Sequence, residues 1–189
     1  FGGESFQPTD VTVFTAQQLL DAMNLSRVET ITLGNPVTLN LTQPVDVHAQ
    51  AFSLITTAVN SLTLAAGSLI LGASQAAGQH IAAAGSLVVK AVDGETLGDF
   101  SNLVTTGASS VLEVSGTVDG TGATLGGLAV ECEADATLTL TAAQAHGRAI
   151  SGAGSLTITG LENTPNADLS GTSVTAEVQV NDTLAFGGT

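Results

Sequence analysis

The three histidines are the side chains of this chain best suited to bind a metal ion. His48, His80 and His146 do not have the spacing of a zinc motif relative to one another. In the internal repeat described below, His146 corresponds to Ala77, so the two copies share no histidine. We therefore interpret each histidine as structural or solvent-facing, and we expect neither a metal site nor a cofactor.

The acidic residues and the single cysteine do not indicate a reactive site. Asp93-Gly94-Glu95 and Asp119-Gly120 are typical of turns. A calcium site would need several converging oxygens, as in a D-x-D-x-D-G loop. Cys132 lies between Glu131 and Glu133, whose charges disfavour a thiolate. We expect Cys132 to be a small buried residue.

Serine and threonine are abundant, but they lie in no nucleophile motif. The chain has no G-x-S-x-G elbow and no Cys–His context for covalent catalysis. A sugar cleft usually needs aromatic platforms or several cations, and the chain has no Trp or Tyr and only 3 Lys and Arg residues. We therefore expect no enzyme activity. A carbohydrate-active β-helix with paired carboxylates across a groove is kept as an alternative.

The charge of the chain excludes two classes of partner. The sequence has 17 acidic and 3 basic residues, which gives a formal net charge of −14. Such a surface cannot neutralise phosphates, so neither nucleic acid nor an anionic membrane surface is expected as a partner. No apolar run approaches the ~20 residues of a transmembrane helix, so we expect no membrane insertion. The few Lys and Arg residues offer little to trypsin-like proteases, which suits an extracellular protein.

Two segments of the chain are copies of one another. Residues 69–87 and residues 138–156 match at a constant offset of 69, so that Ile81 corresponds to Ile150. The copies extend to about residues 69–107 and 138–176. An internal repeat indicates a stack of similar units, whose function follows from assembly more often than from one site.

One helix and two helical turns are predicted from capping patterns. Thr15 and Gln18 have the spacing of a capping box at the start of an apolar helix that ends near Met23. The same T-x-x-Q spacing recurs at Gln144, and Gln75 is its counterpart in the first copy. We interpret these residues as structural caps.

Most of the chain reads as short strands separated by glycine corners. Gly85 and Gly154 are the equivalent corners of the two copies. Apolar residues alternate with threonine or other polar residues in short runs, which include 30–33, 37–41, 62–64, 69–71, 87–89, 111–114, 138–140, 156–158 and 174–178. We expect an all-β fold: a parallel β-helix or β-solenoid with a short N-terminal capping helix. Right-handed crossovers are the usual expectation for parallel strands. A β-sandwich is the alternative.

The second copy carries a resemblance to a known group of proteins. Residues 138–160, followed by Ala167-Asp168-Leu169-Ser170, resemble the units of large bacterial "beta strand repeat" surface and secreted proteins. The resemblance covers roughly residues 60–178 and implies a secreted or cell-surface protein, such as an adhesin, a surface layer or a matrix component. The G-G-x-G-x-D array of the calcium-loaded relatives is missing from this chain, so calcium-dependent folding is not implied.

We divide the chain into three parts. Residues 1–30 are an N-terminal tail and capping helix, residues 31–178 are the solenoid, and residues 179–189 are a C-terminal strand or tail. A solenoid exposes unpaired backbone at both ends, and no cap is evident after residue 174. We therefore expect subunits of a filament, matrix or surface layer that join by exchange of terminal strands. The alternative is a monomeric adhesin module that binds glycan or a host surface. The residues predicted to mediate assembly are Phe1, Phe6, Val178, Val180, Leu184 and Phe186.

Overall fold

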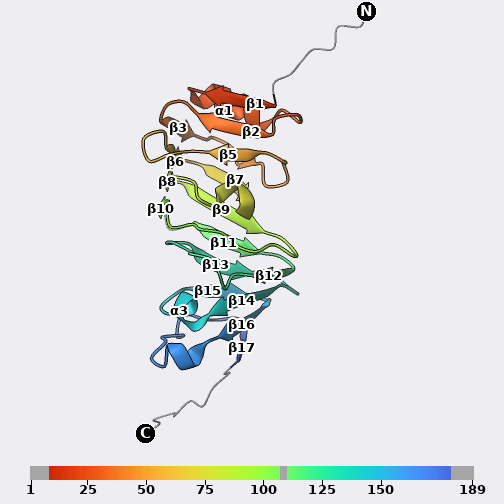
Figure 1. The fold of residues 1–189 in the computed structure, drawn as a ribbon, viewed down its shortest axis with the longest axis vertical. Coiled ribbons are helices and arrows are strands. Elements are labelled where there is room, and N and C mark those ends of the chain that lie inside the picture. Colours follow the sequence, from red (N-terminus) through yellow and green to blue (C-terminus); the bar gives the residue numbers. More distant parts are fainter. Residues whose placement is uncertain (1–8, 107–109, 180–189) are drawn as a thin grey trace, which may run out of the picture.

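Strands stacked along one long axis make up most of the protein. The computed structural model describes residues 9–106 and 110–179, with the N-terminal end at the top of Figure 1 and the C-terminal end at the bottom. Four sheets are formed, and every strand pairing between described residues is parallel. This pattern confirms a mostly β, parallel fold. The antiparallel sandwich that was kept as the alternative is wrong for the described residues.

The strands belong to sheets that we call A to D. Sheet A contains β1 (Asp10–Val13), β2 (Thr30–Leu33) and β5 (Ser53–Ile55). Sheet B contains β3 (Val37–Asn40), β6 (Leu62–Ala66), β8 (Ile81–Ala83) and β10 (Leu103–Thr105). Sheet C contains β4 (Val45–Asp46), β7 (Ser68–Gly72), β9 (Ser86–Ala91), β11 (Val111–Val114), β13 (Ala129–Cys132) and β15 (Ile150–Gly152). Sheet D contains β12 (Thr117–Asp119), β14 (Thr137–Thr141), β16 (Ser155–Thr159) and β17 (Thr175–Val178).

Helices are few and short. They are α1 (Ala16–Met23), α2 (Ala73–Ala76), α3 (Ala142–Ala145) and the 3₁₀ turn η1 (Leu161–Asn163). No helix of the described residues is long and apolar enough to cross a membrane.

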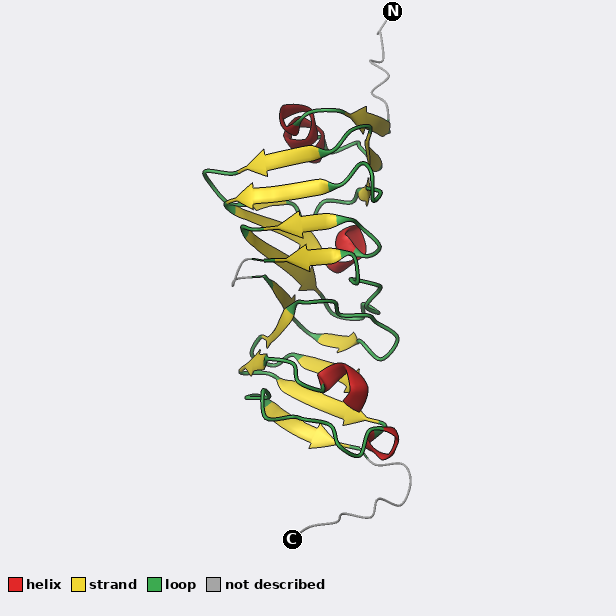
Figure 2. Ribbon diagram, turned by 90° about the vertical axis from the view of Figure 1, so that its left-hand side faces the viewer, coloured by secondary structure: helices red, strands yellow, loops and turns green. Residues whose placement is uncertain are grey.

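The core consists of columns of aliphatic side chains that run along the stack. Leu69 and Leu71 of β7 lie opposite Leu87 and Val89 of β9, and all four are fully buried. Alternation turns every second side chain inward, so each layer covers the one before it. Burying a Leu or Val in this way contributes about 1.5–3 kcal/mol. Figure 2 shows the strands lying one above another along the axis.

The N-terminal end of this core is covered. Leu19, Ala22 and Met23 of α1 are buried, and α1 contacts β1, β2 and β3. The segment before the helix also forms a strand, β1, which pairs with β2. Residues 10–13 within the predicted tail therefore belong to sheet A.

The two copies of the repeat lie on different sheets. In the first copy, β7 and β9 belong to sheet C and β8 to sheet B. In the second copy, β14 and β16 belong to sheet D and β15 to sheet C. The change occurs where sheet D begins: Thr96 bridges to Asp119 at the end of β12. The second copy is thus displaced along the axis and also moved round it by one sheet.

Candidate assembly surface

The last strand of the stack leaves the inner face of sheet D exposed. Ile158 of β16 is fully buried and lies opposite Val178 of β17, whose side chain is 41% exposed. Leu156 is also fully buried, and its partner Ala176 is exposed. Because partners in a parallel pair point to the same side of the sheet, Ala176 and Val178 are the ends of two core columns.

The whole segment around β17 is incompletely covered. No residue from Thr159 to Gln179 is buried, and Leu161, Leu169 and Val174 are half-buried against the core. Within the described part of the chain, β17 pairs with β16 alone, so its outer backbone edge is open. An open strand edge is a template for another strand. The C-terminal end therefore differs from the helix-covered N-terminal end.

Of the residues predicted to mediate assembly, the structure describes one. Val178 lies on β17, at the exposed end of a column. The others lie outside the described residues: Phe1, Phe6, Val180, Leu184 and Phe186.

The predicted cap of α1 is present, with one difference in its partners. Thr15 is the N-cap, and its hydroxyl oxygen accepts a hydrogen bond from the Gln18 N–H at 3.2 Å. The Gln18 side chain accepts from the N–H of Phe14, one residue before the cap, at 2.8 Å. In a capping box, the Gln18 side chain would accept from the N–H of the cap residue, Thr15. Here it accepts from the residue before the cap and so holds the chain that enters the helix.

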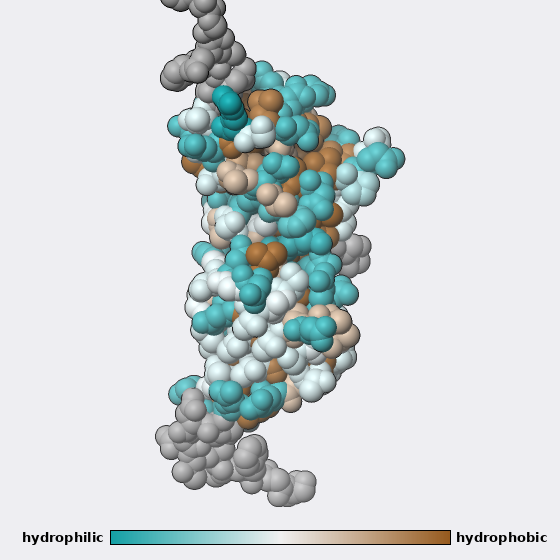
Figure 3. Space-filling model, turned by 90° about the vertical axis from the view of Figure 1, so that its right-hand side faces the viewer, coloured by the Kyte–Doolittle hydropathy of each residue, from teal (hydrophilic) through white to brown (hydrophobic). Residues whose placement is uncertain are grey.

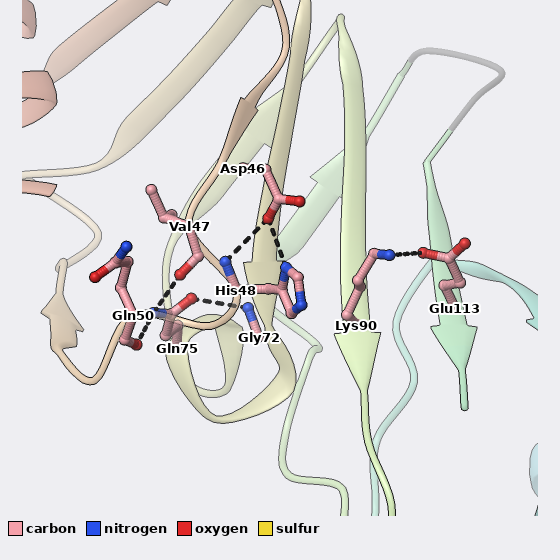
Figure 4. A network of polar contacts seen from close by, with 8 residues as sticks. All are labelled: Asp46, Val47, His48, Gln50, Gly72, Gln75, Lys90 and Glu113. Carbon is pink, nitrogen blue, oxygen red and sulfur yellow. Dashed lines mark hydrogen bonds and ion pairs between the residues drawn. The ribbon is translucent and has the colours of Figure 1, made fainter. Parts of the chain in front are cut away.

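The equivalent glutamines of the two copies link successive layers. The Oε1 of Gln75 accepts from the Gly72 N–H at 2.8 Å, and its Nε2 donates to the carbonyl oxygens of Val47 and Gln50 at 3.0 and 2.8 Å (Figure 4). Gln75 is only 2% exposed, so these bonds satisfy polar groups that water cannot reach. The first bond closes the cap of α2, and the two bonds from Nε2 join α2 to the corner of the preceding layer.

Gln144 repeats this arrangement at α3. Its Oε1 accepts from the Thr141 N–H at 2.7 Å, and its Nε2 donates to the carbonyl oxygens of Gly120 and Ala123, both at 2.6 Å. Thr141 adds the hydroxyl that Gly72 lacks, and the Gln144 N–H donates to it at 3.2 Å. The two glutamines are therefore structural caps that also bridge layers.

The turns that receive these glutamines form a second repeat that the sequence analysis missed. Val47–Gln50 and Gly120–Ala123 are each closed by a backbone hydrogen bond of 2.9 Å. An aspartate precedes each turn, and the Oδ1 atoms of Asp46 and Asp119 accept from the N–H two residues later. These turns are offset by 73 rather than 69 residues, which hid the match. The shared Val-Asp dipeptide before each turn was the available signal.

The corner glycines are required by the backbone of the preceding corner. A Cβ on Gly85 would lie 2.5 Å from the Gly67 carbonyl oxygen. A Cβ on Gly154 would lie 2.7 Å from the Ala136 carbonyl oxygen and closer still to that of Glu133. No real Cβ tolerates such an approach, so close stacking of corners explains both glycines.

The outward face of sheet C carries the charged contacts. Lys90 Nζ lies 3.1 Å from Glu113 Oε2 on the next strand (Figure 4). The hydrogen bond to Glu113 raises the pKa of Lys90, although partial burial opposes it. Burial raises the pKa of Asp46, but hydrogen bonds from the side chain and backbone of His48 outweigh it and lower the pKa overall. The Lys90–Glu113 pair links two neighbouring strands, and the Asp46–His48 pair is local to one segment; both lie on an outer surface.

The remaining candidates for chemistry do not converge either. The described residues contain no cluster of three or more His, Cys, Asp and Glu side chains that would hold a metal ion. Cys132 is fully buried on β13, and burial, with the nearby Glu131, raises its pKa to about 11. A thiol of this kind is protonated and shielded at neutral pH.

Comparison with known proteins adds no assignment. No protein-family model, curated protein or solved structure matches the chain.

Proposed function

We propose that this chain is a right-handed β-solenoid that serves as a structural extracellular protein. Copies of it associate end to end into a filament, matrix or surface layer. The β17 end of one copy accepts a terminal strand of the next copy, which extends sheet D by β-augmentation. The observation that carries the proposal is the exposed end of the core column at Val178, next to fully buried Ile158.

A second copy of this chain is the occupant that best suits this end. A strand with apolar residues at alternate positions would bury Ala176 and Val178 and pair with the open edge of β17. The chain is composed of such strands, and its own layers already associate in this way along sheet D. Few charges interrupt the surface, since charged residues make up 11% of the sequence.

The proposed location is secreted or on a bacterial cell surface. It rests on the resemblance of residues 138–160 to "beta strand repeat" units and on the scarcity of Lys and Arg. A reporter fusion tested by protease treatment of intact cells examines the location independently of assembly.

Electron microscopy and light scattering of the purified full chain test the assembly. We expect the wild-type protein to form oligomers or filaments and Val178→Glu to remain monomeric with an unchanged circular dichroism spectrum. The matched control is Val59→Glu, because Val59 is 78% exposed between β5 and β6 and the substitution adds the same charge. Filaments of Val178→Glu like those of the wild type would contradict the proposal.

Two truncations identify the strand that is donated. Removal of residues 1–8 leaves β1 intact, and we expect it to abolish higher-order assembly while the monomer stays folded. Removal of residues 180–189 tests whether the chain's own C-terminal segment covers β17 instead. Assembly that appears only after this second truncation would show that the end is covered within one chain, and the proposal of exchange between copies would be wrong.

A further inference from the structure

A hollow beside α3 gathers the residues that distinguish the second copy of the repeat from the first. It has a volume of about 310 Å³ and is lined by Gly126–Ala129 and His146–Ala149. His146 corresponds to Ala77 and Arg148 to Gln79 in the first copy. The hollow therefore lies where the two copies differ: His146 stands in place of an alanine, and the charged Arg148 stands in place of a neutral glutamine.

Arg148 lies in the hollow with its charge uncompensated by a carboxylate. Its Nε donates to the Gln144 carbonyl oxygen at 3.1 Å, its Nη2 to that of Gly126 at 3.1 Å, and its Nη1 to that of Leu128. The ion pairs of the described residues do not include it. A guanidinium has five N–H donors, so these three bonds leave two available. Arg148 is half-buried, and this burial lowers its pKa.

His146 adds a donor at the same place. Its Nδ1 accepts a hydrogen bond from the Asp168 N–H at 2.8 Å. With Nδ1 as the acceptor, the ring proton lies on Nε2, which can donate to a ligand. The carboxylate of Asp168 accepts from the Ser170 N–H at 3.0 Å and remains an anion near His146, so the attraction for a bound carboxylate must come from Arg148.

In the first copy, the residue at this position is hydrogen-bonded within the protein. Both polar atoms of the Gln79 side chain bond to the backbone: its Oε1 accepts from the Thr56 N–H at 2.9 Å, and its Nε2 donates to the Ala77 carbonyl oxygen at 2.9 Å. No charge is placed there. The first copy thus stacks without a charge here, whereas Arg148 in the second copy bonds the carbonyl oxygens of Gly126 and Leu128 and still has two N–H donors to offer.

We propose that this hollow binds a small carboxylate ligand of about the size of one sugar acid. Arginine is the side chain best matched to a carboxylate, and His146 supplies a second donor. The volume is at the lower end of that of small-molecule sites, roughly 300–1,000 Å³. The wall residues are small and include no aromatic ring, so a neutral sugar would find no stacking surface. The site does not depend on the end-to-end assembly proposed above.

Binding is tested by NMR titration of the full chain with D-galacturonate and, as the neutral match, D-galactose. We expect saturable shifts with galacturonate, confined to the amides of residues 126–129 and 146–149, and none with galactose. Equal binding of the two sugars, or no saturable shifts with galacturonate, would overturn the proposal. Acetate is the third probe, and acetate binding as tight as that of galacturonate would show that the hollow recognises charge without the sugar.

Three variants assign the binding to named side chains. Arg148→Gln installs the first-copy residue, and we expect it to weaken binding roughly ten- to hundredfold. Because Arg148 also holds Gly126 and Leu128, His146→Ala is the second variant, expected to weaken binding severalfold without affecting these bonds. Lys90→Gln removes a cation from sheet C and serves as the control. A loss of binding with Lys90→Gln equal to that with Arg148→Gln would indicate a general charge effect and overturn the site.

Discussion

Ile158 and Val178 are partners in neighbouring strands of sheet D, and the layer that covers Ile158 has no counterpart over Val178 in the described chain. Ile158 is completely shielded, whereas 41% of Val178 is exposed. The contrast arises because each inward side chain of a stack is covered by the next layer. The end of sheet D therefore presents apolar surface that one more strand would bury.

Self-association at this end should depend on salt. A net charge of −14 makes copies repel one another at low ionic strength. The screening length falls from about 30 Å at 0.01 M salt to about 8 Å at 0.15 M. We expect the mean mass from light scattering to rise over this range for the wild type and to stay at the monomer value for Val178→Glu. A mass that falls with added salt would indicate that charge attraction, rather than apolar strand addition, drives association.

Gln75→Ala should destabilise the fold more than any exposed glutamine substitution. It removes three hydrogen bonds and leaves the backbone groups of Gly72 and Val47 buried without their partner, while the Gln50 carbonyl oxygen can turn to water. We expect a loss of about 2–4 kcal/mol in urea unfolding. Gln17→Ala is the control: its side chain donates to Asp21 on an exposed helix face, and we expect a change within about 0.5 kcal/mol. Equal losses for the two variants would contradict the bridging role of Gln75.

Gly154→Ala should be costly although its backbone is not left-handed. The added methyl group would meet the carbonyl oxygens of Glu133 and Ala136 at the stacked corner. We expect a loss of about 1–3 kcal/mol and a lower melting temperature. Gly122→Ala is the matched variant, because a Cβ there meets nothing within 4 Å. If the two variants melted together, the corners would not be packed as the structure has them.

Cys132 should make stability fall at alkaline pH. Burial, with the nearby Glu131, raises its pKa from 9.0 to about 11, so the folded state holds the thiol proton more tightly than the unfolded state. The resulting stabilisation is complete below about pH 9 and is lost as the pH rises to about 11. We expect a shallower decline of unfolding free energy over this range for Cys132→Ala. A thiol reagent should also label the native protein at pH 8 only as fast as it unfolds.

The strands with clear alternation were predictable, and the shortest ones were not. Runs such as 30–33 and 111–114 coincide with β2 and β11 because their inward residues are apolar and their outward residues polar. β4 has two residues, Val45 and Asp46, and is a strand only because they pair with Leu69 and Ile70 of β7. A partner 24 residues away in the sequence leaves no local pattern at β4 itself.

The candidate site was predictable only in part, for the same reason. The alternation of residues 174–178 predicted a strand, and β17 covers Thr175–Val178. The exposure of Val178 depends on whether another layer covers it, and the alternation within a single strand does not predict that. The hollow at Arg148 also escaped notice, since it is formed by Gly126–Ala129 some twenty residues earlier in the chain.

The sequence by itself determined the repeat, the capping glutamines and the glycine corners. The caps are local: the side chains of Gln75 and Gln144 accept from the N–H groups of Gly72 and Thr141, three residues earlier, so the sequence spacing predicts them. The corners were predictable because glycine marks turns, although their packing reason lies in the preceding layer. Tertiary structure alone decided that the second copy moves round the axis by one sheet. It also decided that the core ends exposed at Val178. Both depend on which layer lies against which, and the burial of a side chain is a property of its neighbours in space.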